Sequence, residues 1–300
     1  MDICMILDNS ETPQHPVIGP MLRQLSAAHS VRLLDVRTLA GDEAVAHEEA
    51  RSLADLYLLK GHSLPALEVG HHLEQRGALV VNNWASSMAC QDRVLMAERM
   101  KRARLPFPRI WSCPSLADVR TQRRLLSTLR FPLMVKSRYS RRGDLVDKVQ
   151  DMEQVHRLAG RWGNEPVILQ DVVHSDGWDI RGWVIDQQIF VARRRTPLEA
   201  GDPTQFLPVP VETIPGDWRS LMRETGRAFD LHLFSVDLLM TDQGPCIVDV
   251  DSFPGFRGAA GAVSALIALI ERLGAERPGR PEGTGPGAVR RQRARANRGS

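Results

Sequence analysis

Residues 234–256, FSVDLLMTDQGPCIVDVDSFPGF, are the stretch that decides the fold and the chemistry of this chain. Two apolar runs are joined by a turn sequence, which predicts a hairpin with strands over residues 234–240 and 246–251. Asp249 and Asp251 are two residues apart, so on a strand they point to the same face. The hairpin also brings Asp237 alongside them from the neighbouring strand.

Three carboxylates in one place repel each other unless a cation lies among them. Hard oxygen ligands of this kind suit Mg²⁺ or Mn²⁺, usually together with substrate phosphates. Apolar residues flank the carboxylates: Ile247, Val248, Val250 and Phe253. Because these residues would bury the strand, a metal site is favoured over ordinary surface acids at a strand end. We therefore predict that Asp237, Asp249 and Asp251 are metal ligands.

The segments before this hairpin have two different periods. The first 82 residues alternate short apolar runs with amphipathic segments, which is typical of a small parallel βαβ domain. Asp8 follows the first run, where a dinucleotide-binding domain would carry Gly-x-Gly-x-x-Gly, so this domain is expected to hold a substrate. From residue 131 onward the apolar period is two, which indicates antiparallel sheets and an α+β arrangement.

Charge and cysteine usage narrow the class of protein. The net charge is +3, but residues 276–300 carry seven arginines against two glutamates, which leaves the 275-residue body at −2. The body thus has no excess of basic residues for nucleic acid, and only the Gly-, Pro- and Arg-rich tail could reach such a partner. The four cysteines show no CxxC spacing, and we find no signal peptide or membrane span. We expect a cytoplasmic protein with a disordered basic tail.

Six segments, taken in chain order, resemble the ATP-grasp superfamily over roughly residues 1–274, and in particular the RimK-like carboxylate-amine ligases. They are VNNWASSMACQDR (81–93), RLPFPRIW (104–111), FPLMVKS (131–137), VILQDVV (167–173), GWDIRGWVID (177–186) and the hairpin of residues 234–256. The intervals of 12 residues from Asp237 to Asp249 and of two to Asp251 are similar to those of RimK-type glutamate ligases.

The resemblance implies an α/β N-terminal domain followed by an α+β ATP-grasp fold, whose two subdomains clamp the nucleotide. The expected boundaries are 1–83 for the N-terminal domain, 84–174 for the central or lid subdomain, 175–275 for the C-terminal subdomain with the metal site, and 276–300 for the tail. The cofactors implied are ATP and Mg²⁺ or Mn²⁺. The residues implied to contact ATP are Arg93, Lys136, Gln170, Asp171, Val172, Val173 and Asp179.

Arginines are the expected catalytic groups. Lys136 and Arg93 would neutralise phosphates. Lys136 lies on an apolar, interior strand, so a surface lysine that extends its ammonium group to solvent is the weaker interpretation. Arg181 belongs to the resembling segment GWDIRGWVID. Among Arg193, Arg194 and Arg195, which could instead be a solvated strand end, we choose Arg194 to meet the reacting carboxylate, since alternate strand residues face opposite sides.

Three departures from the family's usual residues affect the expected site. Arg93 stands where lysine is common, and Asp249-Val250-Asp251 stands where Glu-x-Asn is common. The lid, SRYSRRGD (137–144), has three arginines in place of small residues, which puts the usual backbone cradle for phosphates in doubt. Adjacent cations are costly unless an anion joins them, so we expect at least one of Arg138, Arg141 and Arg142 to serve an acidic second substrate.

The expected activity is that of an ATP-dependent ligase, which joins a small-molecule or peptide carboxylate to an amine through an acyl phosphate. The segment DVDSFPGF (249–256) also resembles inositol-phosphate kinases of the same superfamily, so a hydroxyl acceptor is the second hypothesis. A nucleotide-binding regulator without turnover is the third. The oligomeric state stays open, a homo-oligomer included.

Deletion of residues 276–300 should leave the melting temperature and the activity nearly unchanged, because the tail has few apolar side chains to bury and its charges are solvated. Differential scanning calorimetry of the two chain lengths checks this. A fall of several degrees on deletion would show that the tail packs on the body.

Overall fold

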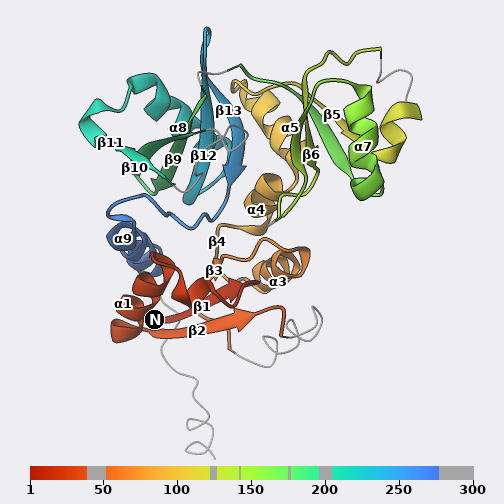
Figure 1. Cartoon of the computed structure of the whole chain (residues 1–300). Coiled ribbons are helices and arrows are strands. Elements are labelled where there is room, and N and C mark those ends of the chain that lie inside the picture. The colour runs from red at the N-terminus through yellow and green to blue at the C-terminus, as the bar shows by residue number, and fades with distance from the viewer. Residues whose placement is uncertain (39–51, 122–126, 142, 175–176, 196–204, 277–300) are drawn as a thin grey trace, which may run out of the picture.

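The computed structural model describes residues 1–38, 52–121, 127–141, 143–174, 177–195 and 205–276. Three sheets make up this part of the chain, one in the N-terminal domain and two above it in Figure 1. The predicted tail after Glu276 lies outside the described residues, as does Arg142 of the lid. Within the described residues, no helix combines the length and the apolar character that crossing a membrane requires.

The N-terminal sheet is parallel throughout, in the order β2-β1-β3-β4, which confirms the βαβ prediction. Its elements are β1 (Asp2–Leu7), η1 (Thr12–Gln14), α1 (Ile18–Ala28), β2 (Ser30–Asp35), β3 (Leu56–Leu59), α3 (Leu64–Gln75) and β4 (Val80–Val81). Pairing is in direct register, with Ile3 opposite both Val31 and Leu56. Both faces of this sheet are covered by helices, as parallel sheets require.

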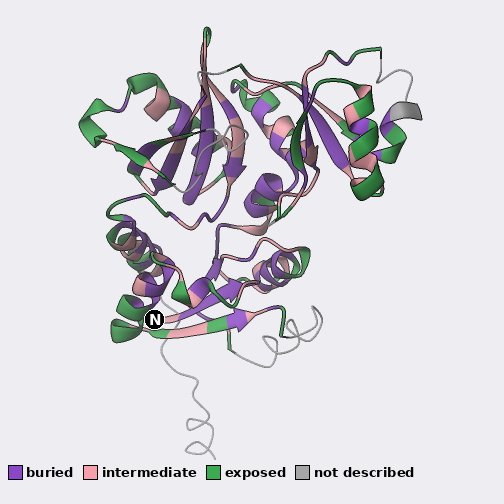
Figure 2. Ribbon diagram, viewed as in Figure 1, coloured by how far each residue is buried: buried purple, intermediate pink, exposed green. Residues whose placement is uncertain are grey.

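Two cores form on the two faces of the N-terminal sheet, because successive strand residues point to opposite sides (Figure 2). Ile3 and Met5 pack against α1 and α9 (Ala262–Ala275), whereas Cys4 and Ile6 pack against α3. The helix α9 therefore packs between the N-terminal sheet and the C-terminal sheet, and it lies against α1 in Figure 1. The expected boundary at residue 275 assigns this helix to the C-terminal subdomain, and it shares one core with both domains.

The C-terminal sheet is antiparallel, in the order β11-β10-β9-β12-β13. Its strands are β9 (Trp178–Ile185), β10 (Gln188–Arg195), β11 (Leu207–Val209), β12 (Leu233–Thr241) and β13 (Gly244–Asp251), with η3 (Val211–Thr213) and α8 (Gly216–Phe229) alongside. The helices α4 (Trp84–Gln91) and α5 (Arg93–Ala103) share its core through residues such as Cys90, Met96 and Met100. The expected boundaries place these two helices in the lid subdomain, but their buried apolar residues pack in the core of this sheet.

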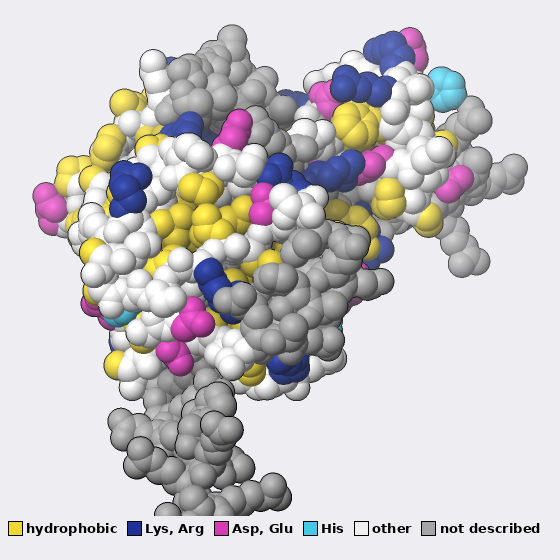
Figure 3. All heavy atoms as spheres, turned by 90° about the horizontal axis from the view of Figure 1, so that it is seen from below, with side chains coloured by type: hydrophobic (Ala, Val, Ile, Leu, Met, Phe, Trp, Pro, Cys, Tyr) yellow, Lys and Arg dark blue, Asp and Glu magenta, His cyan; other side chains and the backbone are white. Residues whose placement is uncertain are grey.

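The lid sheet is antiparallel in the order β5-β8-β6-β7 and stands beside the C-terminal sheet in Figure 1. It consists of β5 (Ile110–Cys113), β6 (Leu133–Ser137), β7 (Val146–Val149) and β8 (Val167–Asp171), covered by η2 (Ala117–Thr121) and α7 (Met152–Trp162). Seen from below in Figure 3, basic and acidic side chains of the described residues are interspersed, without a continuous basic face on that side.

Asn82 ties the N-terminal domain to the C-terminal sheet. Its Nδ2 group donates to the carbonyls of Leu233 and Ser252, and its Oδ1 accepts from the backbone N–H of His232 at 2.8 Å. The side chain is fully buried, so these backbone groups have no access to water as a substitute partner. One amide thus links the end of β4, the start of β12 and the chain after β13.

Replacing Asn82 with alanine should lower the free energy of unfolding by about 2–4 kcal/mol, because buried carbonyl and N–H groups lose their partners. Asn82→Asp should be at least as damaging, since it removes both donors and adds a buried charge. Urea titration measures the free energy of unfolding of both variants. Gln243→Ala, at an exposed turn residue, is the control and should change that free energy by less than about 0.5 kcal/mol. An Asn82→Ala protein as stable as the control would rule out this joint.

Candidate functional site

A cavity of about 460 Å³ lies between the lid sheet and the C-terminal sheet. It contains all seven residues implied to contact ATP, and its lining comes from α5, β6, β8, β9, β10, β12 and β13. Its lining includes Arg93, Lys136, Gln170, Asp171, Val172, Val173, Asp179, Arg194, Asp237 and Asp249. Of the predicted site residues, Arg181 and Asp251 instead line a smaller neighbouring cavity, described below.

Lys136 points into this cavity from β6, a strand whose other residues are mostly buried. Its Nζ lies 3.4 Å from the carbonyl of Val248 on β13, so the lid lysine reaches the opposite sheet. Burial lowers the pKa of Lys136 to about 8, against the attraction of Asp249. An anion in the cavity would favour the charged form, which is what a phosphate-binding lysine requires.

Arg93 is buried at the first turn of α5 and anchors the lid loop. Its Nη1 donates to the carbonyl of Ser137 and to Asp144, both at 2.7 Å, and Asp92 caps the same helix by accepting from the N–H of Val94. Its Nε has no hydrogen-bond partner among the described residues. Arg93 therefore lines the cavity, fastens the lid loop and keeps one buried donor without a partner among the described residues.

Gln170 supplies a second unused donor. The residue is buried on β8, and its Nε2 has no hydrogen-bond partner within the part of the chain that the structure describes. The next residue, Asp171, accepts from Arg109 Nε at 3.2 Å. Buried donors without partners are uncommon in folded proteins, so both Gln170 and Arg93 fit a ligand that carries acceptor atoms.

The three carboxylates lie in a row along the hairpin. Asp237 pairs with Asp249 across β12 and β13, and Asp251 pairs with Ser235 one step further along. Arg181 from β9 lies among them and donates through Nη1 to both oxygens of Asp237, at 2.9 and 2.7 Å. Burial opposes the charge of Arg181, but the three carboxylates outweigh it and raise its pKa.

Each carboxylate has a different environment. Asp237 also accepts from Arg194 Nη2 at 3.1 Å, so two arginines neutralise it. Asp249 accepts no hydrogen bond and has no ion pair within the described residues, and burial raises its pKa although Arg93 and Lys136 oppose the shift.

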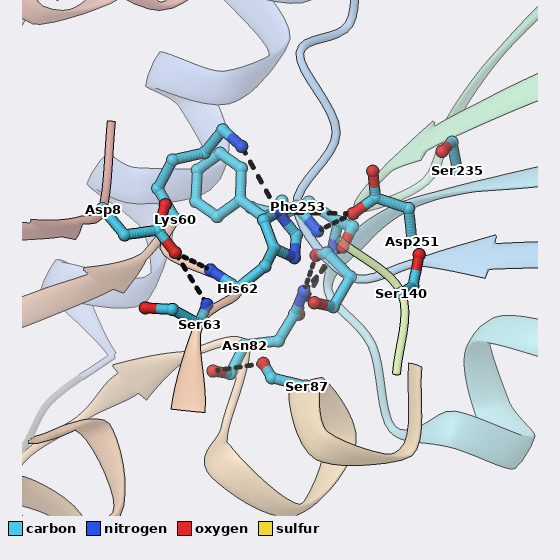
Figure 4. Close-up of polar contacts among 12 residues, drawn as sticks. Asp8, Lys60, His62, Ser63, Asn82, Ser87, Ser140, Ser235, Asp251 and Phe253 are labelled. Atoms are coloured by element: carbon cyan, nitrogen blue, oxygen red, sulfur yellow. Dashed lines mark hydrogen bonds and ion pairs between the residues drawn. The ribbon is translucent and has the colours of Figure 1, made fainter. Parts of the chain in front are cut away.

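Asp251 faces the N-terminal domain, where it accepts from the N–H of Phe253 and lies 3.7 Å from His62 Nε2 (Figure 4). Burial would raise the pKa of Asp251, but His62, Lys60 and Arg181 together hold it below its usual value. Among the described residues, no group of three or more carboxylate, histidine or cysteine side chains is placed to share one metal ion. Asp237 and Asp249 face each other across the hairpin and Asp251 lies one step further along, so the role of the three as metal ligands stays a prediction.

The arginine run on β10 alternates as predicted. Arg194 points into the cavity, with its Nε 3.4 Å from Asp179, whereas Arg193 and Arg195 stack on the ring of Trp178 at 4.9 and 4.2 Å from its centroid. The choice of Arg194 as the inward residue of the three is confirmed.

The lid arginines already have anionic partners within the chain. Arg138 forms an ion pair with Asp92, and Arg141 forms one with Glu165, at 2.7 and 2.6 Å. Neither arginine therefore needs the external anion that the sequence led us to expect. Arg141 nevertheless lines the cavities on the side of the N-terminal domain.

A second, larger cavity of about 1260 Å³ was not found by sequence reasoning. It lies against the N-terminal domain and is lined by Asp8, Lys60 and His62, together with residues of the lid loop and of the segment after β13. A third cavity of about 220 Å³, called the neck below, lies next to both: His62, Gln91 and Arg141 line it and the larger cavity, and Asp249 lines it and the smaller one. The polar residues that directly follow β1 and β3 are the feature of the sequence that could have indicated this cavity.

Comparison with known proteins agrees with this arrangement. Residues 116–271 match the RimK-like ATP-grasp domain family. A probable alpha-L-glutamate ligase of Xanthomonas oryzae pv. oryzae is 30% identical over 126 residues, and one of Shewanella amazonensis is 26% identical over 126 residues. The alignments cover 40% and 37% of this chain, and only 42% and 40% of those ligases.

Solved structures show the same fold at low identity. The RimK domain ATP-grasp protein of Sphaerobacter thermophilus superposes with a TM-score of 0.69 at 17% identity, covering 91% of this chain and 99% of that one. The D-alanine–D-alanine ligase of Bacillus anthracis, in complex with ATP, gives 0.70 at 17% identity, covering 92% and 97%. The match over more than half of the sequence shows that this chain belongs to the RimK-like ATP-grasp family.

Proposed function

We propose that this chain is an ATP-dependent ligase that joins a carboxylate to an amine through an acyl phosphate. The observation that carries this proposal is the set of neighbouring cavities: a cation-lined space between two antiparallel sheets shares Asp249 with the neck, and the neck shares His62, Gln91 and Arg141 with a separate cavity on the N-terminal domain. A nucleotide and a second substrate can therefore meet at the row of carboxylates.

In the proposed reaction, a carboxylate oxygen attacks the γ-phosphorus of ATP while the bond to the bridging oxygen of ADP breaks. An amine then attacks the acyl carbon, phosphate leaves with the bonding electrons, and the amine proton passes to solvent. Lys136 and the free Nε of Arg93 would hold phosphate oxygens, and Arg194 would orient the carboxylate. Arg181 would keep the three carboxylates in place.

Mg²⁺ or Mn²⁺ fits two of the predicted ligands. Asp249 has unused oxygens, and Asp237 uses about three of its roughly four lone-pair sites on Arg181 and Arg194, which leaves one. Asp251 is engaged by the N-terminal domain. When bound by Asp249 and Asp237, the metal would offset negative charge on the phosphoryl group.

The names of the relatives suggest glutamate as one substrate, and the large cavity can accept a small carboxylate or part of a peptide. The kinase hypothesis has no comparable support. Phe253 and Phe256, two residues of the segment DVDSFPGF (249–256) that carries this resemblance, are fully buried and pack in the core shared by the N-terminal domain and α9. The free thiols of the four cysteines accord with a cytoplasmic location.

The purified chain, given MgATP with pools of amino acids and small carboxylates, should release ADP and phosphate, and hydroxylamine should trap an acyl hydroxamate. Asp249→Asn should lose at least about a hundredfold in kcat with the fold intact, because it removes a ligand charge without changing the size of the side chain. Asp242→Asn, an exposed acid at the turn of the same hairpin, is the matched control. Release of AMP and pyrophosphate, or equal activity in both variants, would contradict the proposal.

The affinity for ATP should fall as the pH rises through the pKa of Lys136, which is about 8. Its ammonium form binds phosphate, so going from about pH 7 to about pH 9 should raise the Kd for ATP about tenfold. Lys136→Arg keeps its charge over this range and should bind ATP with a nearly constant Kd. Calorimetric titrations at both pH values test this, and an equal pH dependence in the two proteins would exclude Lys136 as its source.

A further inference from the structure

The larger cavity lies at a position on the N-terminal sheet where ligands commonly bind in α/β proteins. It lies at the carboxyl ends of the parallel strands, where Asp8 follows β1, Arg37 follows β2 and Lys60 follows β3. The strand order β2-β1-β3-β4 places β2 and β3 on opposite sides of β1. In open α/β sheets ligands bind in the crevice at such a point, because the connecting loops separate there.

Most charged groups that line this cavity already have partners. Arg37 forms an ion pair with Asp35 at 2.7 Å, and Arg141 forms one with Glu165. The carboxylate of Asp8 accepts from the backbone N–H groups of His62 and Ser63, at 2.7 and 2.6 Å, where α3 begins (Figure 4). These groups therefore have little capacity left for a ligand.

Lys60 and Arg257 are the exceptions. The Nζ of Lys60 lies 3.4 Å from His62 Nε2 and 5.6 Å from the centre of the Phe253 ring, and Figure 4 shows it directed between these two side chains. Neither Lys60 nor Arg257 has a carboxylate within 4.0 Å among the described residues, although Asp251 and Asp8 attract Lys60 from further away. A partly buried lysine without a counter-ion is costly, and a bound anion would remove that cost.

His15 adds a neutral donor to these two cations. Its Nδ1 accepts from the N–H groups of Val17 and Ile18, at 3.2 and 3.4 Å, which leaves the proton on Nε2. Lys60, Arg257 and His15 all line this cavity, and burial together with the charges of Arg257 and Lys60 lowers the pKa of His15. A Cβ on Gly255 would lie only 2.6 Å from His15 Nε2, so the glycine leaves room for the ring.

We propose that Lys60, Arg257 and His15 Nε2–H form a binding site for an oxyanion, either a carboxylate or a phosphate, on the second substrate. This anion is separate from the reacting carboxyl, which would extend through the neck toward Asp249 and Arg181. The substrate would thus carry two anionic groups. Its assignment as a substrate rests on the proposed function, whereas the binding of the anion does not.

Calorimetry on the full chain without nucleotide tests the site with succinate and with inorganic phosphate, and succinamide serves as the uncharged control. At least one of the two anions should bind below about 10 mM, and succinamide should not. Binding of succinate alone identifies a carboxylate site, and binding of phosphate alone identifies a phosphate site. Failure of both anions to bind would overturn the proposal.

Variants then locate the site. Lys60→Met and Arg257→Gln should each weaken anion binding about tenfold and leave the Kd for ATP unchanged, since one charge-assisted contact is lost far from the nucleotide cavity. Arg257 is exposed, so its variant gives a result even if Lys60→Met fails to fold. Arg37→Gln, a paired cation of the same cavity, should change anion binding less than twofold. An equal loss of anion affinity in all three variants would show general electrostatic attraction and refute a specific site. The Kd for ATP reports separately on the proposed function.

Discussion

Charge balance around Arg181 is the constraint on which the arrangement of this molecule depends. Three carboxylates stand along one hairpin, and burial penalises each of them unless a cation compensates it. The cations come from separate elements: Arg181 from β9, Arg194 from β10, Lys136 from the lid and Lys60 from the N-terminal domain. The two antiparallel sheets and the N-terminal domain therefore converge on this hairpin, and the neighbouring cavities lie where they meet.

The N-terminal domain and the C-terminal sheet are held together by buried contacts. The last described helix, α9, packs in a core that both share, and Asn82 joins them through buried hydrogen bonds. Loop residues at the ends of β1 and β3 are thereby held against the site, and His62 lies 3.7 Å from Asp251. In the proposed ligase, such a fixed placement would position a second substrate relative to ATP at little entropic cost on binding.

The departures from the family's usual residues acquire physical reasons in this structure. Arg93 uses its Nη1 to fasten the lid loop through Ser137 and Asp144 and still keeps an unused donor at the cavity, a combination that a lysine's single ammonium would not provide in the same geometry. The additional negative charge of Asp251 is compensated by His62 and Lys60. The lid arginines find Asp92 and Glu165 and so cost less than adjacent unpaired cations would.

The sequence by itself determined the elements and most of the nucleotide cavity. Strand period, the turn at residues 241–244 and the alternation that turns Arg194 inward are local properties, so the hairpin, Lys136 and residues 170–173 could be placed from the sequence alone. Only the tertiary structure decided that Asp251 lies beside His62, that α4, α5 and α9 pack in the cores of other domains, and that Lys60, Arg257 and His15 line one cavity. These outcomes depend on contacts between residues that are up to about 270 positions apart, and charge compensation over such separations leaves no periodic signal in a single sequence.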